Sequence, residues 1–128
     1  MKITRFLSIV ALILGSAMVS FGQERAATAI SSDNFVSSNL KGSYTFIVPN
    51  DITAKDVALS AEYYTMYFTV TFDEKNHQTL ITMKDMSDNA KHIIGRFFIS
   101  LGLREIQYNG NYFQVEDFYQ KFLKTEKK

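Results

Sequence analysis

The chain has 128 residues, of which 46% are hydrophobic and 14% aromatic, and it contains neither cysteine nor tryptophan. This length predicts one domain whose core holds the fold without disulfide bonds. Lysine and arginine together number 14 against 13 acidic residues. A charge so close to neutral argues against electrostatic binding of nucleic acid or of an anionic membrane.

The N-terminal segment has the pattern of a secretory signal peptide. A basic start at residues 1–5 precedes an apolar run from Phe6 to Val19, and Ser20 and Gly22 are small residues before a cleavage point at Gln23. The apolar run is short for a membrane span. We therefore predict removal of residues 1–22 and export to the periplasm or the medium, with no membrane attachment after cleavage.

Residues 23–43 are rich in serine and show no clear hydrophobic period, which predicts a flexible leader. The folded domain is predicted over residues 44–124 and a charged tail over 125–128. Residues 44–48 predict a first strand that ends at Pro49. A helix follows, for which Thr53 and Asp56 have the spacing of a capping box.

The central hairpin is predicted from two runs with alternating apolar positions, residues 66–73 and 77–84, around a polar turn. A turn at Asp73 to Asn76 predicts that four residue pairs share the apolar face, namely Phe72 with His77, Val70 with Thr79, Phe68 with Ile81 and Met66 with Met83. The opposite face is then mostly hydroxyl and amide groups.

Helical spacing continues after the hairpin, from Ala90 to Leu101, with Asp85 or Ser87 as the N-cap and Gly102 as the C-terminal glycine. Residues 104–108 predict a fourth strand. Asn109-Gly110 is a strong turn signal that allows residues 111–114 to pair back. A short amphipathic helix is predicted over residues 115–123.

This β-α-β-β-α-β order predicts an α+β domain of the ferredoxin-like type, an antiparallel four-stranded sheet with two helices on one face, plus a short C-terminal helix. Over residues 44–108 the order of elements resembles two families, the heavy-metal-associated domain and the sporulation-related repeat. The first resemblance implies a metal loop between the first strand and helix, and the second implies binding of cell-wall glycan.

The loop at Val48 to Asp56, where the heavy-metal-associated family holds its ion, contains no cysteine, methionine or histidine. Without such ligands it cannot hold Cu(I) or a structural zinc ion. The glycine-containing signature of the sporulation-related repeat is also missing. Met66 and Met83 are interpreted as packing residues on the apolar face of the hairpin, and neither a metal site nor a cofactor is predicted.

Nucleophilic catalysis finds no support, because there is no thiol and no Gly-x-Ser-x-Gly motif, and His77 and His92 lie in a turn and on an exposed helix face. We predict that the protein is not an enzyme. The polar face of the sheet has few aromatic or basic residues, which excludes the RNA-binding use of such a sheet.

A possible partner-binding surface remains, and it comprises Tyr67, Thr69, Thr71, Leu80 and Thr82 on the polar sheet face with Leu59 and Tyr63 on the outer face of the first helix. The alternative is that the C-terminal helix covers the sheet face. We predict a small non-catalytic binding module of the bacterial envelope whose partner is a protein or a cell-wall ligand. Two further hypotheses are a degenerate heavy-metal-associated domain with a residual metal-binding or chaperone-like role, and a protease-inhibitor or propeptide-like domain. The sequence leaves the oligomeric state open.

Overall fold

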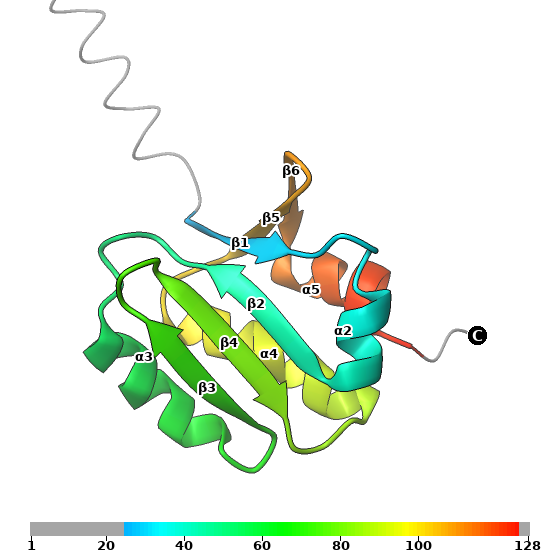
Figure 1. Cartoon of the computed structure of the whole chain (residues 1–128), viewed down its shortest axis with the longest axis horizontal. Helices are drawn as coiled ribbons and strands as arrows, with labels where there is room; N and C mark the ends of the chain where they lie inside the picture. Colours follow the sequence, from blue (N-terminus) through cyan, green and yellow to red (C-terminus); the bar gives the residue numbers. More distant parts are fainter. Residues whose placement is uncertain (1–24, 126–128) are drawn as a thin grey trace, which may run out of the picture.

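The computed structural model describes residues 25–125, so the predicted signal peptide at residues 1–22 and the last three residues of the predicted tail lie outside the described part. The described chain is α+β, with one six-stranded sheet in the order β3-β4-β2-β1-β5-β6 (Figure 1). In chain order the strands are β1 (Ala26–Ile30), β2 (Ser43–Ile47), β3 (Phe68–Asp73), β4 (Gln78–Met83), β5 (Glu105–Tyr108) and β6 (Asn111–Gln114).

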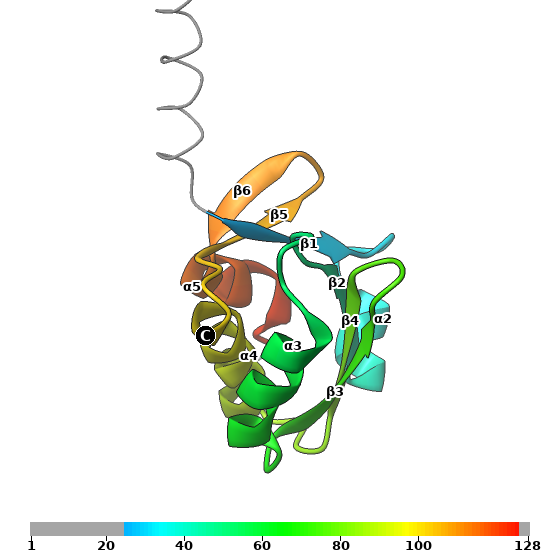
Figure 2. The same cartoon turned by 90° about the vertical axis from the view of Figure 1, so that its left-hand side faces the viewer.

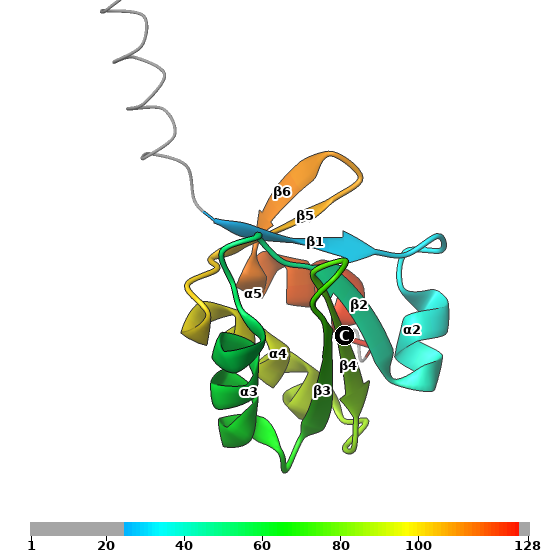
Figure 3. The same ribbon diagram turned by 60° about the vertical axis from the view of Figure 1, so that its left-hand side comes forward.

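Helices α3, α4 and α5 lie on one face of this sheet (Figure 2). Helix α2 lies beside the start of β2, on the far side of the molecule from α3 (Figure 3). In chain order the helical segments are α2 (Val36–Lys41), α3 (Ala54–Ala61), the short η1 (Glu62–Tyr64), α4 (Asp88–Ser100), α5 (Val115–Phe118) and the π-helical turn η2 (Tyr119–Leu123). The predicted α+β class is thus confirmed.

The predicted four-stranded antiparallel sheet is wrong, because β1 and β6 add two strands and β1 pairs in parallel with β5. Strand β1 lies within residues 23–43, which were predicted to be a flexible leader. Its Ala27 and Ala29 are buried, and it pairs with β2 on one side and with β5 on the other. Because β1 is paired on both sides, the hydrogen bonds of its backbone hold it in the sheet without large side chains. Its sequence, which is mostly alanine, therefore shows little β propensity.

The second part of the predicted leader is ordered by Phe35, whose side chain is fully buried. Its ring contacts Tyr108, Phe118 and Phe122, with centroids 4.8, 5.2 and 5.5 Å away. The Phe35 backbone adopts φ 70°, a left-handed conformation that is rare for a bulky residue. This aromatic anchor holds the entry to α2 in place.

The central hairpin has the predicted faces but not the predicted register. Phe72 pairs with Thr79 and Phe68 with Met83, a shift of two residues from the prediction, and Met66 is left exposed before the strand. The turn keeps four residues but lies one residue later than predicted, at 74–77 instead of 73–76, with His77 at a left-handed φ of 53° and Asp73 accepting hydrogen bonds from the backbone of Lys75 and Asn76. A two-residue shift keeps each side chain on the same face.

The helix ends follow the sequence closely. Thr53 and Asp56 form the predicted capping box of α3, and Ser87 caps α4 by accepting a hydrogen bond from the Ala90 backbone. Gly102, at φ 81°, ends α4, and the Leu103 N–H donates to the Phe98 carbonyl across it, as in a Schellman motif. These caps therefore fix where the chain enters α3 and α4 and where it leaves α4.

The C-terminal helix packs beside α4, on the face of the sheet that α3 and α4 cover. The ring of Phe118 lies 6.2 Å from that of Phe46, which also stacks edge-on against Phe98 of α4 at 4.6 Å. The alternative in which this helix covers the polar sheet face is therefore wrong. The polar face stays free of α3, α4 and α5 (Figure 2).

Candidate functional site

The uncovered face of the sheet carries the strand side chains that point away from α3 and α4, and we call it the open face. One row of cross-strand neighbours crosses all six strands and comprises Asp73, Gln78, Ile47, Thr28, Gln107 and Tyr112. With neighbouring strands about 4.8 Å apart, the row extends over roughly 24 Å along the sheet. It is long enough for an extended ligand.

The open face is mainly uncharged. Five threonines contribute hydroxyl groups, each both donor and acceptor, and these are Thr28, Thr45, Thr69, Thr71 and Thr82. Exposed apolar side chains lie between them, namely Ile30, Ile47, Leu80 and Tyr112. Among the paired strand residues of this face, only Asp73 and Glu105 are charged.

The structure separates the seven residues predicted from the sequence into three places. Thr69 pairs with Thr82 and Thr71 pairs with Leu80, and these four are exposed together on the open face. Tyr67, just before β3, is half-buried and packs against the core. The remaining two, Leu59 and Tyr63, are exposed in the helix layer and do not share the open face.

The sequence did not predict two residues of the open face, Thr28 and Tyr112, which lie on either side of Gln107. The Thr28 hydroxyl lies 3.4 Å from the Gln107 side-chain oxygen, within hydrogen-bonding distance. Gln107 pairs in turn with Tyr112, whose ring is 59% exposed. Thr28 joins the face because β1 enters the sheet beside β5, whereas Tyr112 joins it because β6 pairs with β5. The Asn109-Gly110 turn was the one sequence signal that placed Tyr112 near Gln107.

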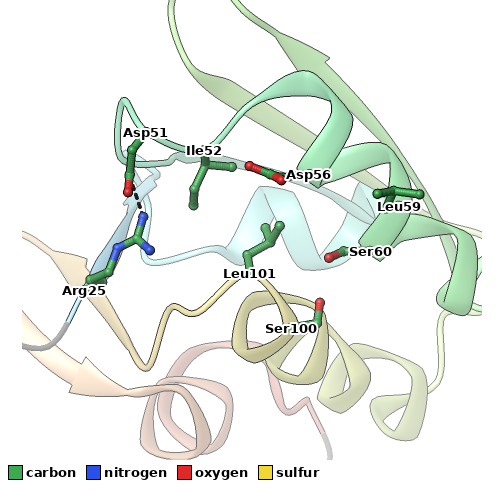
Figure 4. A pocket seen from close by; sticks show the side chains of 8 residues that line it. All are labelled: Arg25, Asp51, Ile52, Asp56, Leu59, Ser60, Ser100 and Leu101. Atoms are coloured by element: carbon green, nitrogen blue, oxygen red, sulfur yellow. Dashed lines mark hydrogen bonds and ion pairs between the residues drawn. The ribbon is translucent and has the colours of Figure 1, made fainter.

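Leu59 lines a pocket of about 390 Å³ between α3 and the C-terminal end of α4 (Figure 4). The lining residues are Arg25, Asp51, Ile52, Asp56, Leu59, Ser60, Ser100 and Leu101. At one end of the pocket Arg25 forms an ion pair with Asp51. The guanidinium also reaches toward Gly102, past the end of α4, where the helix dipole favours a positive charge.

Most polar groups of this pocket are already engaged in contacts that hold the fold. Hydrogen bonds from the backbone and side chain of Thr53 keep the pKa of Asp56 below its ordinary value. The Ser100 hydroxyl donates to the Phe97 carbonyl at 2.6 Å. The two carboxylates of this pocket are therefore engaged in a helix cap and in an ion pair.

A second pair of titratable groups joins α4 to α5. His92 contacts the Glu116 carboxylate and stacks on the Tyr119 ring, with centroids 4.3 Å apart. The pKa of Glu116 is lowered, first by a hydrogen bond from Gln120 and then by His92. These contacts hold α4 against α5 and η2. His92 and Glu116 also line a pocket of about 260 Å³.

Metal ligands are dispersed in the part of the chain that the structure describes. No group of three or more histidine, cysteine, aspartate or glutamate side chains is placed to hold an ion there. His77 lies in the hairpin turn with its Nδ1 atom buried and unpaired, and His92 is on α4. Met66 is exposed whereas Met83 is buried, so the two do not form a thioether pair.

Comparison with protein-family models, with curated proteins and with solved structures finds no match to this chain. Between residues 25 and 125, none of the helices has the length and apolar character needed to cross a membrane.

Proposed function

We propose that the protein is an exported, non-catalytic binding module of the bacterial envelope, and that it binds its ligand on the open face. The uncovered six-stranded face carries the proposal. A wide sheet surface that α3, α4 and α5 leave uncovered presents hydroxyl, amide and apolar groups in one continuous row, of which Asp73, Ile47 and Tyr112 are exposed and the others half-buried. A sheet whose only role was structural would gain stability by burying such apolar groups.

The fold itself supports a finer proposal. Without β1 and β6, the remaining strands follow the order β3-β4-β2-β5, with β2 parallel to β3 across the antiparallel β4. This is the arrangement of a ferredoxin-like sheet, and we propose that the chain is an elaborated ferredoxin-like domain in which the N-terminal strand enters between the first and last strands of the basic unit.

The ligand class that fits the open face best is an uncharged glycan. Threonine hydroxyls and the amides of Gln78 and Gln107 are donors and acceptors for sugar hydroxyl groups. Tyr112 and Ile47 offer apolar surface for the faces of sugar rings. The near absence of charge disfavours strongly acidic or basic ligands. Together with the predicted export, these properties point to the glycan of the cell wall.

The test is an amide-resolved NMR titration of the protein with soluble cell-wall glycan fragments. We expect shifts at Thr28, Gln107, Tyr112 and Leu80. Tyr112→Ala should weaken binding about tenfold, as expected for an exposed aromatic anchor. The matched control is Tyr63→Ala, which removes an exposed tyrosine ring from the helix layer and should leave the affinity unchanged.

Shifts confined to residues of the helix layer, or an affinity that Tyr63→Ala lowers as much as Tyr112→Ala, would contradict the proposal. Absence of any shift would remove glycan as the ligand.

A further inference from the structure

We propose that the groove between α2 and η2 is a binding site for an anionic amphiphile with a single acyl chain, such as a free fatty acid. This groove is the largest of the three pockets described in the structure, at about 660 Å³. Its lining residues are Asn34, Val36, Asn39, Leu40, Lys121, Phe122, Lys124 and Thr125. It lies apart from the open face and from the pocket beside α3.

The apolar part of the groove is supplied by α2 and by Phe122. Val36 and Leu40 are four residues apart on α2, so they lie on one side of the helix. They are 59% and 79% exposed. Isolated exposed aliphatic residues are ordinary, but two on one helical side beside an aromatic wall form an apolar strip. An acyl chain along this strip would remove it from water.

The two walls are joined before any ligand binds. The Asn39 side-chain amide donates to the Phe122 carbonyl at 2.8 Å, and its oxygen accepts from the Tyr44 hydroxyl. On the other side, Asn34 and Phe35 hold left-handed backbone conformations that the buried Phe35 ring maintains. Strained conformations persist where the surrounding structure fixes them. A site that is already formed loses less free energy on binding.

The charged side chains that line the groove have one sign, and the nearest carboxylate held by a lining residue is Asp88, which accepts hydrogen bonds from Thr125. Lys121 and Lys124 line it, and none of the lining residues is acidic. Within residues 25–125 neither lysine takes part in a salt bridge. The Lys121 ammonium lies 5.5 and 5.9 Å from the ring centroids of Phe113 and Phe122, which places it at the edge of the apolar wall. A carboxylate head beside the lysines with its tail on Val36 and Leu40 matches both features.

The experiment is calorimetric and NMR titration of the purified protein with dodecanoate below its micelle-forming concentration. Dodecanol and dodecyltrimethylammonium serve as neutral and cationic probes of the same chain length. We expect dodecanoate to bind with amide shifts at Val36, Leu40 and Lys121, and the other two probes to bind at least tenfold more weakly, because opposite charge sets the preference.

Variants test the two halves of the site separately. Lys121→Glu combined with Lys124→Glu should lower dodecanoate affinity at least tenfold, whereas Lys75→Glu in the hairpin turn is the charge control and should not. Leu40→Ser should weaken all three probes, and Ile99→Ser, on the exposed side of α4, is its matched control.

Three results would overturn the proposal. These are no binding of dodecanoate, equal binding of all three probes, or an affinity that the double lysine variant leaves unchanged. Vesicles containing phosphatidylglycerol form a further arm. Binding to these vesicles without binding of dodecanoate would assign the groove to a membrane surface instead of a single amphiphile and would reject the site as proposed.

Discussion

The ring of Phe35 meets the ring of Phe118 edge to face, with centroids 5.2 Å apart, and so joins the segment before α2 to the C-terminal helix α5. Both side chains are fully buried. The contact makes the N-terminal part of the described chain a component of the core.

Phe35→Ala should therefore lower the free energy of unfolding by about 3–5 kcal/mol, the usual cost of a cavity left by a buried aromatic ring. Urea denaturation followed by circular dichroism measures this loss. Tyr63→Ala removes an exposed ring and should change the free energy by no more than about 0.5 kcal/mol. A loss below about 1 kcal/mol for Phe35→Ala would show that the core tolerates its absence.

Thr28→Pro should destabilise the protein by about 3 kcal/mol or more, because proline lacks the backbone N–H that a central strand donates and is tolerated only at sheet edges. Thr28→Val is the control, since it keeps the branched shape and the N–H, and it should cost about 1 kcal/mol or less. Chemical denaturation of both variants gives the comparison. Equal losses would argue that β1 is dispensable to the sheet.

Gly42→Ala and Gly110→Ala should both be destabilising, because the two glycines have φ of 73° and 79°. The backbone cost is about 1 kcal/mol at each site. Gly42→Ala should cost more, because its added methyl group would overlap the Met86 sulfur and lie 3.3 Å from the Met83 Cβ, whereas nothing lies near Gly110.

Adding Met86→Ala to Gly42→Ala should recover the steric part of that loss and leave the backbone part. Thermal unfolding of Gly42→Ala, Gly110→Ala, Met86→Ala and the Gly42→Ala/Met86→Ala double variant measures these losses of stability. If Gly110→Ala proved the more costly of the two single changes, the close approach of Met86 to Gly42 would be irrelevant to stability.

Burial, together with the charge of Asp88, raises the pKa of Tyr44 above its ordinary value. Near pH 10 and above, tyrosine in the unfolded chain loses its proton while the folded Tyr44 keeps it. Stability is thus complete below about pH 10 and falls as the pH rises through the raised pKa. Denaturation curves measured between pH 8 and pH 11 should show this decline, because that interval spans the ordinary tyrosine pKa of about 10.

Tyr44→Phe is the variant that isolates this effect. It should cost about 1 kcal/mol at neutral pH, because the hydrogen bond to Asn39 is lost. Its stability should then fall less steeply than that of the unchanged protein in alkali. Parallel alkaline declines in the two proteins would place the titrating group elsewhere.

The sequence predicted those parts of the fold that local pattern determines. Alternation between Phe68 and Phe72 assigned the faces of the hairpin correctly, and Thr53 and Ser87 marked the starts of α3 and α4. The predicted register was wrong because His77, with its left-handed backbone, belongs to the turn, which therefore lies one residue later than predicted, and nothing in the residue type requires that conformation. Strand β1 was missed because its short run of small residues resembles a linker.

The candidate site was also predicted where local pattern determines it and missed where it depends on tertiary pairing. The exposure of Thr69, Thr71, Leu80 and Thr82 follows from alternation within one hairpin. The continuity of the open face from β2 to β5 depends instead on β1, whose Thr28 pairs with Gln107 from the other half of the described chain. Such pairing is set by the tertiary packing of β1 and β5, and no local property of either strand predicts it.

The position of β1 also affects how the protein can assemble as it is made. Strand β1 precedes every other strand in the chain, yet its parallel partner β5 is the fifth of the six to be synthesised. Until β5 is available, the sheet lacks one side of its middle strand, and the late pairing has to close a long loop at an entropic cost. A chain with this connectivity stays open until most of it has emerged. Under the proposed export, that delay would favour passage of the unfolded polypeptide through a narrow translocation channel.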